Sequence, residues 1–129
     1  MINIFFIAIG GALGSILRYV LSNYIQFYIK SPFPFATISV NIIGSFLIGI
    51  CYYLSKNNDF YNNFFSENLK LFLIIGIFGG FTTFSTFSLD FFKLMEQEQF
   101  LLAAGYVFLS VFLSLIAVFA GYFIVKQII

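Results

Sequence analysis

Four long apolar segments constrain the fold of this chain more than any other feature of its sequence. They run from about Ile2 to Tyr28, from Phe35 to Leu54, from Leu69 to Leu94 and from Phe100 to Val125. A helix needs about 20 apolar residues to cross the hydrocarbon core of a bilayer, and each segment is long enough. Only 9% of the 129 residues are charged, and 61% are hydrophobic. We therefore predict an all-α integral membrane protein, embedded in membrane lipid, whose residues 1–129 form a single transmembrane domain of four helices.

The third segment contains a stretch that is unfavourable for an uninterrupted helix. It reads Gly-Gly-Phe-Thr-Thr-Phe-Ser-Thr-Phe-Ser over residues 79–88. Glycine lowers helix stability by about 1 kcal/mol relative to alanine, and adjacent β-branched threonines do not restore it. We therefore predict that the third helix breaks near Gly79–Thr83. Breaks of this kind in membrane proteins tend to mark transport sites. The alternative is that the glycines form a packing seam and that the serine and threonine hydroxyls bond back to their own helix.

The other three segments carry polar side chains at depths where such groups are unfavourable. Arg18 lies well before the first segment ends, so its charge must snorkel to the interface, pair, or face water. Asn41, in the middle of the second segment, either holds helices together or offers its NH₂ group to a transported species. On the fourth segment, a line of hydroxyls about 12 Å long indicates either a polar track or simple packing. Its members are Tyr106, Ser110 and Ser114.

The residue types that the sequence lacks narrow the chemistry. There is no histidine, one cysteine (Cys51), and neither a basic cluster nor a Walker loop. These absences argue against an enzyme, a cysteine-rich or histidine metal site, and a nucleic-acid partner. We expect no carboxylate in mid-span, since Asp90 falls where the third helix returns to water, and proton-coupled transporters generally need such an acid. The remaining hydroxyls, amides and phenylalanine edges suit a passive route for a small anion, whereas freed carbonyls suit a small cation.

Lysine and arginine are evenly distributed between the two sides of the predicted membrane domain. Membrane orientation is normally set by an excess of these residues on one side. Three lie on the side of the termini and three on the opposite side: Lys56, Lys70 and Lys126 against Arg18, Lys30 and Lys93. We therefore predict insertion in both orientations. Four helices are too few to enclose a pathway comfortably, so two opposed copies are expected to form an antiparallel homodimer.

Four motifs give the chain a resemblance to a known family. They are Gly10–Tyr19 (GGALGSILRY), Thr37–Phe46 (TISVNIIGSF), Gly79–Ser88 (GGFTTFSTFS) and the ladder of Tyr106, Ser110 and Ser114. With these motifs in this order, the chain resembles the Fluc (CrcB) fluoride channels along essentially its whole length. The resemblance implies a dual-topology, antiparallel homodimer in the bacterial inner membrane, with two fluoride pores that both subunits line. It also implies a role in fluoride resistance, because the channel lets cytoplasmic fluoride leave the cell.

The resemblance further implies roles for individual residues in the pore. Asn41 matches the family's pore asparagine, whose side chain donates to the anion. Phe84 and Phe87 match the aromatic pair whose ring edges contact fluoride. The polar track of the family corresponds here to Ser85, Thr86, Tyr106, Ser110 and Ser114.

Two further implications of the resemblance concern positive charge. A structural Na⁺ at the dimer centre would be held by the backbone carbonyls of Gly79 and Thr82. Arg18 would be the basic residue of an aqueous vestibule that attracts anions.

Two other functions stay open from the residues alone. A small dual-topology exporter of drugs or metabolites would need a titratable acid within a span. A membrane assembly subunit that transports nothing would use Asn41 and the hydroxyls only for packing. The asparagine-rich loop over residues 56–68 has no functional interpretation.

Overall fold

The computed structural model describes residues 2–56 and 66–129, and all regular structure in these ranges is helical. The elements in chain order are α1 (Ile2–Tyr28), α2 (Phe35–Lys56), α4 (Glu67–Lys70), η1 (Leu71–Phe78), α5 (Gly79–Phe81), α6 (Phe84–Glu96) and α7 (Phe100–Ile128). Elements α4 to α6 follow one another along a single span, so four helical rods are long and apolar enough to cross a membrane. The prediction of an all-α protein with four spans is confirmed. The asparagine-rich loop lies largely outside the described residues.

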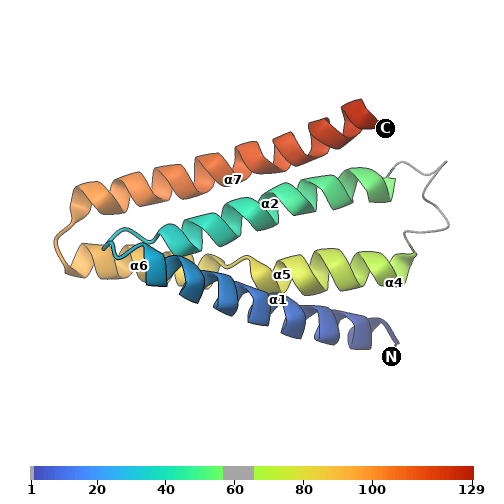
Figure 1. The fold of residues 1–129 in the computed structure, drawn as a ribbon, viewed down its shortest axis with the longest axis horizontal. Helices are drawn as coiled ribbons and strands as arrows, with labels where there is room; N and C mark the ends of the chain where they lie inside the picture. The colour runs from blue at the N-terminus through green and yellow to red at the C-terminus, as the bar shows by residue number, and fades with distance from the viewer. Residues whose placement is uncertain (1, 57–65) are drawn as a thin grey trace.

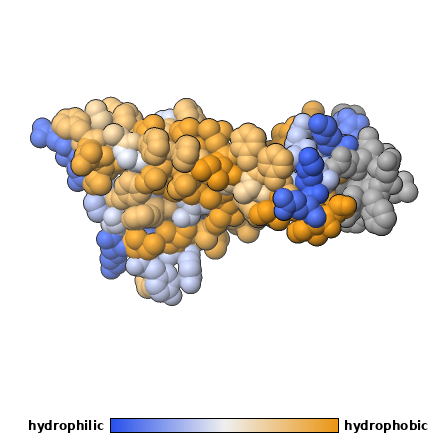
Figure 2. Space-filling view, turned by 90° about the horizontal axis from the view of Figure 1, so that it is seen from above, coloured by the Kyte–Doolittle hydropathy of each residue, from blue (hydrophilic) through white to orange (hydrophobic). Residues whose placement is uncertain are grey.

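The four spans form an up-and-down bundle. Figure 1 shows both termini at one end of the bundle, with the α1–α2 connection and the α6–α7 turn at the other end. Helix α2 packs along α7, and α1 packs along η1 and α5. Figure 2 shows an apolar surface between two hydrophilic ends, the pattern of a protein whose middle lies in hydrocarbon. The chain is therefore a multi-pass membrane protein.

Glycines bring the backbones of neighbouring spans into direct contact. A Cβ atom at Gly10 would lie 2.9 Å from the Cα of Gly76, and one at Gly80 would lie 2.6 Å from the carbonyl oxygen of Gly11. Helix α7 meets α2 in the same way, since a Cβ atom at Gly121 would lie 3.2 Å from the backbone nitrogen of Ile50. Small residues at such seams let membrane helices approach closely. The seams therefore hold α1 against the third span and α2 against α7.

The third span is broken, as predicted, but the break lies at the threonines rather than at the glycines. Thr82 (φ −77°, ψ 156°) and Thr83 (φ −151°, ψ 120°) are extended and separate α5 from α6. Gly79 and Gly80 remain helical at the end of the first half-span, where Gly80 contacts α1. The glycines therefore serve close packing, and β-branched threonines occupy the extended positions that suit them. Just before the break, the Gly79 N–H donates to the carbonyl of Ile74, the wide hydrogen-bond spacing of a π-helix.

Candidate functional site at the helix break

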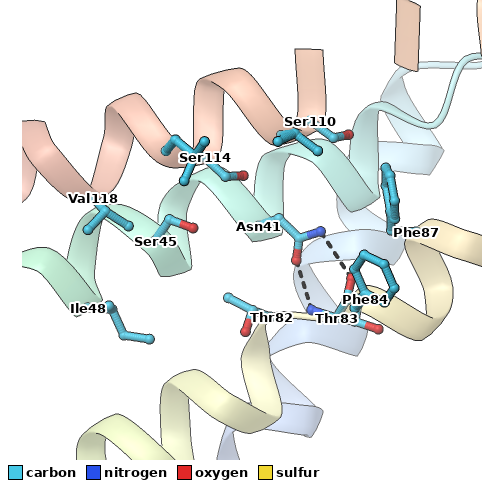
Figure 3. A pocket seen from close by; sticks show the side chains of 12 residues that line it. Asn41, Ser45, Ile48, Thr82, Thr83, Phe84, Phe87, Ser110, Ser114 and Val118 are labelled. Atoms are coloured by element: carbon cyan, nitrogen blue, oxygen red, sulfur yellow. Dashed lines mark hydrogen bonds between the residues drawn. The ribbon is translucent and has the colours of Figure 1, made fainter. Parts of the chain in front are cut away.

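A cavity of about 400 Å³ lies beside the break, between α2, α6 and α7 (Figure 3). It opens on the surface of the protomer. Its walls combine hydroxyls, one carboxamide and two aromatic rings with aliphatic side chains. The lining residues are Asn41, Ser45, Ile48, Thr82, Thr83, Phe84, Phe87, Ser110, Val111, Ser114, Leu115 and Val118. The structure thus brings five of the expected pore residues to one place: Asn41, Phe84, Phe87, Ser110 and Ser114.

Asn41 holds the broken backbone in place. Its Oδ1 accepts from the Thr83 N–H at 2.8 Å, and its Nδ2 donates to the Thr83 carbonyl at 3.1 Å, as Figure 3 shows. In an unbroken helix the Thr83 N–H would bond to the carbonyl of Gly79, four residues earlier. A carboxamide carries two N–H donors, so one remains for another acceptor in the cavity. Asn41 therefore connects two spans, and the same side chain lines the cavity.

The start of α6 points its positive end toward this cavity. Thr83 is the N-cap residue, and its Oγ1 accepts from the Thr86 N–H at 3.1 Å. The first N–H groups of a helix have no partner within the helix, and with the helix dipole they favour a negative charge. The backbone donors at Phe84 and Ser85 are of this kind. Phe84 lines the cavity and Ser85 does not, so a small anion there would meet the Phe84 N–H without any charged side chain.

Two phenylalanine rings form one wall of the cavity. The ring centroids of Phe84 and Phe87 lie 5.3 Å apart with an interplanar angle of 38°. Phe87 is half-buried and lies 5.1 Å from the ring of Tyr106, whereas Phe84 is 77% exposed on the single protomer. Aromatic ring edges carry positive potential, so a pair of rings can contribute weak anion contacts.

Another part of the wall carries hydroxyls of α7. Ser110 is only 4% exposed, and its Oγ has no hydrogen-bond partner among the described residues. Ser114 lies one turn further along the same wall. Buried hydroxyls almost always find a partner, so the Ser110 hydroxyl is a candidate donor to a ligand of the assembled protein, and on the single protomer it is closed off from solvent. Tyr106, the third member of the expected line, is fully buried and lies outside the lining of this cavity.

The Tyr106 hydroxyl instead belongs to a group that the sequence reasoning missed. Asp90 Oδ2 accepts from Thr37 Oγ1 at 2.6 Å and from the Tyr106 hydroxyl at 3.5 Å. We expected Asp90 at the wet end of the third helix, but its side chain is half-buried and bound by two other spans. A signal was present in the sequence, because Asp90 follows Phe87 by three residues and so shares its helix face.

Arg18, from α1, contacts the backbone at the helix break. Its Nη1 donates to the carbonyl oxygen of Thr82 at 3.3 Å, and the side chain is half-buried. Of the three possibilities for this charge, pairing is therefore the one observed. Ser85 and Thr86 are exposed and surround the Thr83 hydroxyl rather than line the cavity. Gly79 is exposed on the protomer surface.

Comparisons with known proteins agree with this arrangement. Residues 5–122 match the family described as "CrcB-like protein, Camphor Resistance (CrcB)". The chain is 46% identical over 129 residues to a protein of Flavobacterium psychrophilum, covering 99% of this chain and 100% of that one. It is 47% identical over 129 residues to a protein of Parabacteroides distasonis, covering 100% and 97%. Both relatives are named "Fluoride-specific ion channel FluC". The chain belongs to the CrcB family.

Proposed function

We propose that this protein is a fluoride-selective passive channel that lets cytoplasmic fluoride leave the cell. The observation that carries the proposal is the cavity at the break, which combines neutral donors with the positive end of α6 and with the unpartnered Ser110 hydroxyl. The names of the relatives supply the ion. Bacterial relatives further favour the bacterial inner membrane as the location.

The lining suits a small anion that must shed water without being trapped. The remaining N–H of Asn41, the Ser110 hydroxyl and the first N–H groups of α6 replace part of the hydration shell of the ion. None of these donors carries a full charge, so binding is weak enough to let the ion move on. The Ser114 hydroxyl lies about 6 Å further along α7, one helical turn away, and offers the next contact. Asp90 is not part of this lining, because its carboxylate accepts from Thr37 and Tyr106 instead.

A second copy of the chain would complete the pathway. On one protomer the cavity is open and Phe84 is 77% exposed, so one wall has to come from elsewhere. The balanced positive charge of the two ends favours insertion in both orientations. In an antiparallel homodimer, the two-fold axis would generate two equivalent fluoride pores. Ser85 and Thr86, which are exposed and do not line the cavity of their own protomer, would then be available to the partner.

The same dimer would bring backbone carbonyls together at its centre, where we propose a structural Na⁺. The groups fit this role, because Gly79 is exposed and the Thr83 N–H that would cover its carbonyl bonds to Asn41 instead. Carbonyls at the ends of half-helices are suitable ligands for Na⁺ in membrane proteins. Gly79 and Thr82 of each copy would hold the ion, which would supply positive charge to bind the opposed half-spans together.

The physiological reason for a passive route lies in the chemistry of hydrogen fluoride. The neutral acid crosses the membrane and dissociates at the neutral pH of the cytoplasm, which traps the anion inside. A channel that conducts only fluoride lets it leave down its gradient without conducting chloride.

Fluoride and chloride efflux from liposomes tests the proposal. Purified protein is reconstituted, the vesicles are loaded with either salt, and a potassium ionophore relieves the charge that efflux builds up. We expect rapid loss of fluoride with retention of chloride, and no loss from protein-free vesicles. Retention of both ions by well-folded protein would contradict the channel and favour an assembly subunit. Fluoride uptake driven by a pH gradient alone would instead indicate a coupled transporter, with Asp90 as its acid.

A further inference from the structure

Arg18 occupies one of the two carbonyls that the proposed cation site uses. The guanidinium Nη1 donates to the Thr82 oxygen at 3.3 Å, from α1 to the end of the first half-span. The contact is fixed by close packing rather than by chance, because a Cβ atom at Gly14 would lie 2.9 Å from the backbone nitrogen of Phe81. Helix α1 therefore has little freedom to withdraw Arg18 from the break.

The contact is also favourable electrostatically. Thr82 is the C-cap residue of the helical run that begins at Glu67, and the carbonyl end of a helix carries partial negative charge. A cation is stabilised there, and Arg18 is the cation that a single protomer supplies. The contact therefore stabilises the end of the first half-span from within the same chain.

We propose that the Arg18 guanidinium competes with the central Na⁺ for the Thr82 carbonyl, so that Arg18 sets the sodium affinity of the assembled protein. The inference rests on the proposed sodium site and deepens it. Two positive charges that share one oxygen lie within a few ångströms of each other and repel strongly in a membrane interior. Arg18 makes no hydrogen bond to the Gly79 carbonyl, so this ligand is free of the competition, and sodium binding is weakened rather than prevented.

This competition has a consequence for assembly. In a single protomer, the Arg18 guanidinium compensates the partial negative charge at the carbonyl end of the first half-span. When two copies meet, the carbonyls of both converge, and the ion gains ligands from the second copy. Each Arg18 guanidinium, in contrast, contacts a carbonyl of its own copy only. Sodium then stabilises the pair of copies more than the single copy, and the repulsion from Arg18 keeps its affinity moderate.

Sodium-dependent thermal stability of the purified protein in detergent tests the competition directly. The thermal midpoint is measured across a range of NaCl at constant ionic strength, with N-methyl-D-glucamine chloride as the replacement salt, and the sodium concentration for half of the effect is compared between variants. Arg18→Gln removes the charge, and Arg18→Met is a second neutral variant that keeps an unbranched side chain. Arg18→Lys keeps the charge, and Lys30→Gln removes a positive charge from an exposed loop position.

We expect the half-effect sodium concentration to fall by at least about tenfold in a neutral Arg18 variant, because the repulsion of a full charge is removed. Arg18→Lys and Lys30→Gln should stay close to the parent. An unchanged or higher concentration in both neutral variants would overturn the competition while leaving the sodium site standing. Sodium independence of every protein, parent included, would contradict the site and the competition together. Fluoride efflux from the same preparations is a separate test, so the channel would stand or fall independently.

Discussion

Asn41 and Thr83 exchange two hydrogen bonds, with the Thr83 N–H at 2.8 Å from Asn41 Oδ1 and Asn41 Nδ2 at 3.1 Å from the Thr83 carbonyl. The carboxamide provides hydrogen-bond partners that the interrupted helix does not, because it bonds both the N–H and the carbonyl of the extended Thr83. A packing role and a pore role for Asn41 are therefore not alternatives, since the same side chain positions the backbone donors and keeps one N–H for the cavity.

We expect Asn41→Asp to abolish fluoride efflux. An aspartate cannot donate to the Thr83 carbonyl, and its charge lies where an anion has to pass. Loss of the hydrogen bond should also lower the free energy of unfolding by about 1–3 kcal/mol. Efflux from liposomes and thermal unfolding in detergent measure the two effects. Ser45→Ala, which changes a neighbouring lining residue with no part in this pairing, is the control, and undiminished efflux in a folded Asn41→Asp variant would refute the role.

Replacing either aromatic ring of the cavity wall should slow fluoride efflux without preventing assembly. Phe84→Ile and Phe87→Ile remove the positive ring edges but keep an apolar side chain. We expect about a tenfold or greater loss of rate for each, and a larger loss of stability for Phe87, because its ring is half-buried against Tyr106. The matched control is Phe92→Ile on the same helix, whose ring is 56% exposed and lies outside the cavity. Rates equal to the parent for both variants would make the rings simple packing residues.

The Ser110 hydroxyl provides a test that separates function from stability. Since its Oγ has no partner among the described residues, Ser110→Ala should leave the fold as stable as the parent or slightly more stable. Fluoride efflux should nevertheless fall, because the ion loses a donor in a buried part of the wall. Ser88→Ala is the matched control, since the Ser88 hydroxyl bonds back to the carbonyl of Phe84 and faces outward. A fall in stability without a fall in efflux would assign Ser110 to packing.

Gly44 should be intolerant of alanine, because it makes room for the break. A Cβ atom there would collide with the Cγ2 of Thr82 and would lie 3.1 Å from the ring of Phe81. We expect Gly44→Ala to lower the free energy of unfolding by about 1–3 kcal/mol and to reduce efflux, as overpacking displaces Thr82. Gly105→Ala is the control, because a Cβ atom at Gly105 meets nothing within 4 Å. Denaturation in detergent compares the two variants. Equal stability would show that the segment around Thr82 shifts at little energetic cost to accommodate the added methyl group.

Much of the fold is predictable from the sequence, for reasons that are local. Hydrophobic length determines the four spans, and the glycine–threonine stretch determines that the third is interrupted. The position of the interruption is less accessible, because Gly80 stays helical to let α1 approach and the extended conformation falls on Thr82 and Thr83. The neighbouring span, rather than helix propensity, decides which glycine serves close packing and which residue leaves the helical conformation.

The site is only partly predictable, because hydrogen-bond partners depend on how spans pack. Asn41, Phe84 and Phe87 stand out in the sequence as residues that are unusual for a membrane segment. Their partners do not, since Thr37 and Asp90 are 53 positions apart and Arg18 and Thr82 are 64 apart. A period of 3.6 residues places a side chain on a face of its helix, but the depth and rotation of each span decide what that face meets.

The two extended threonines also lie where the carbonyl end of one half-span meets the amide end of the next. At Thr82 the carbonyl end of one half-span presents about half a negative charge, and at Thr83 the amide end of the next presents about half a positive charge. The electrostatic potential along the span therefore changes sign across a single peptide bond. The backbone alone, apart from the half-buried Arg18 and Asp90, therefore offers a surface that favours cations on one side of that bond and a surface that favours anions on the other.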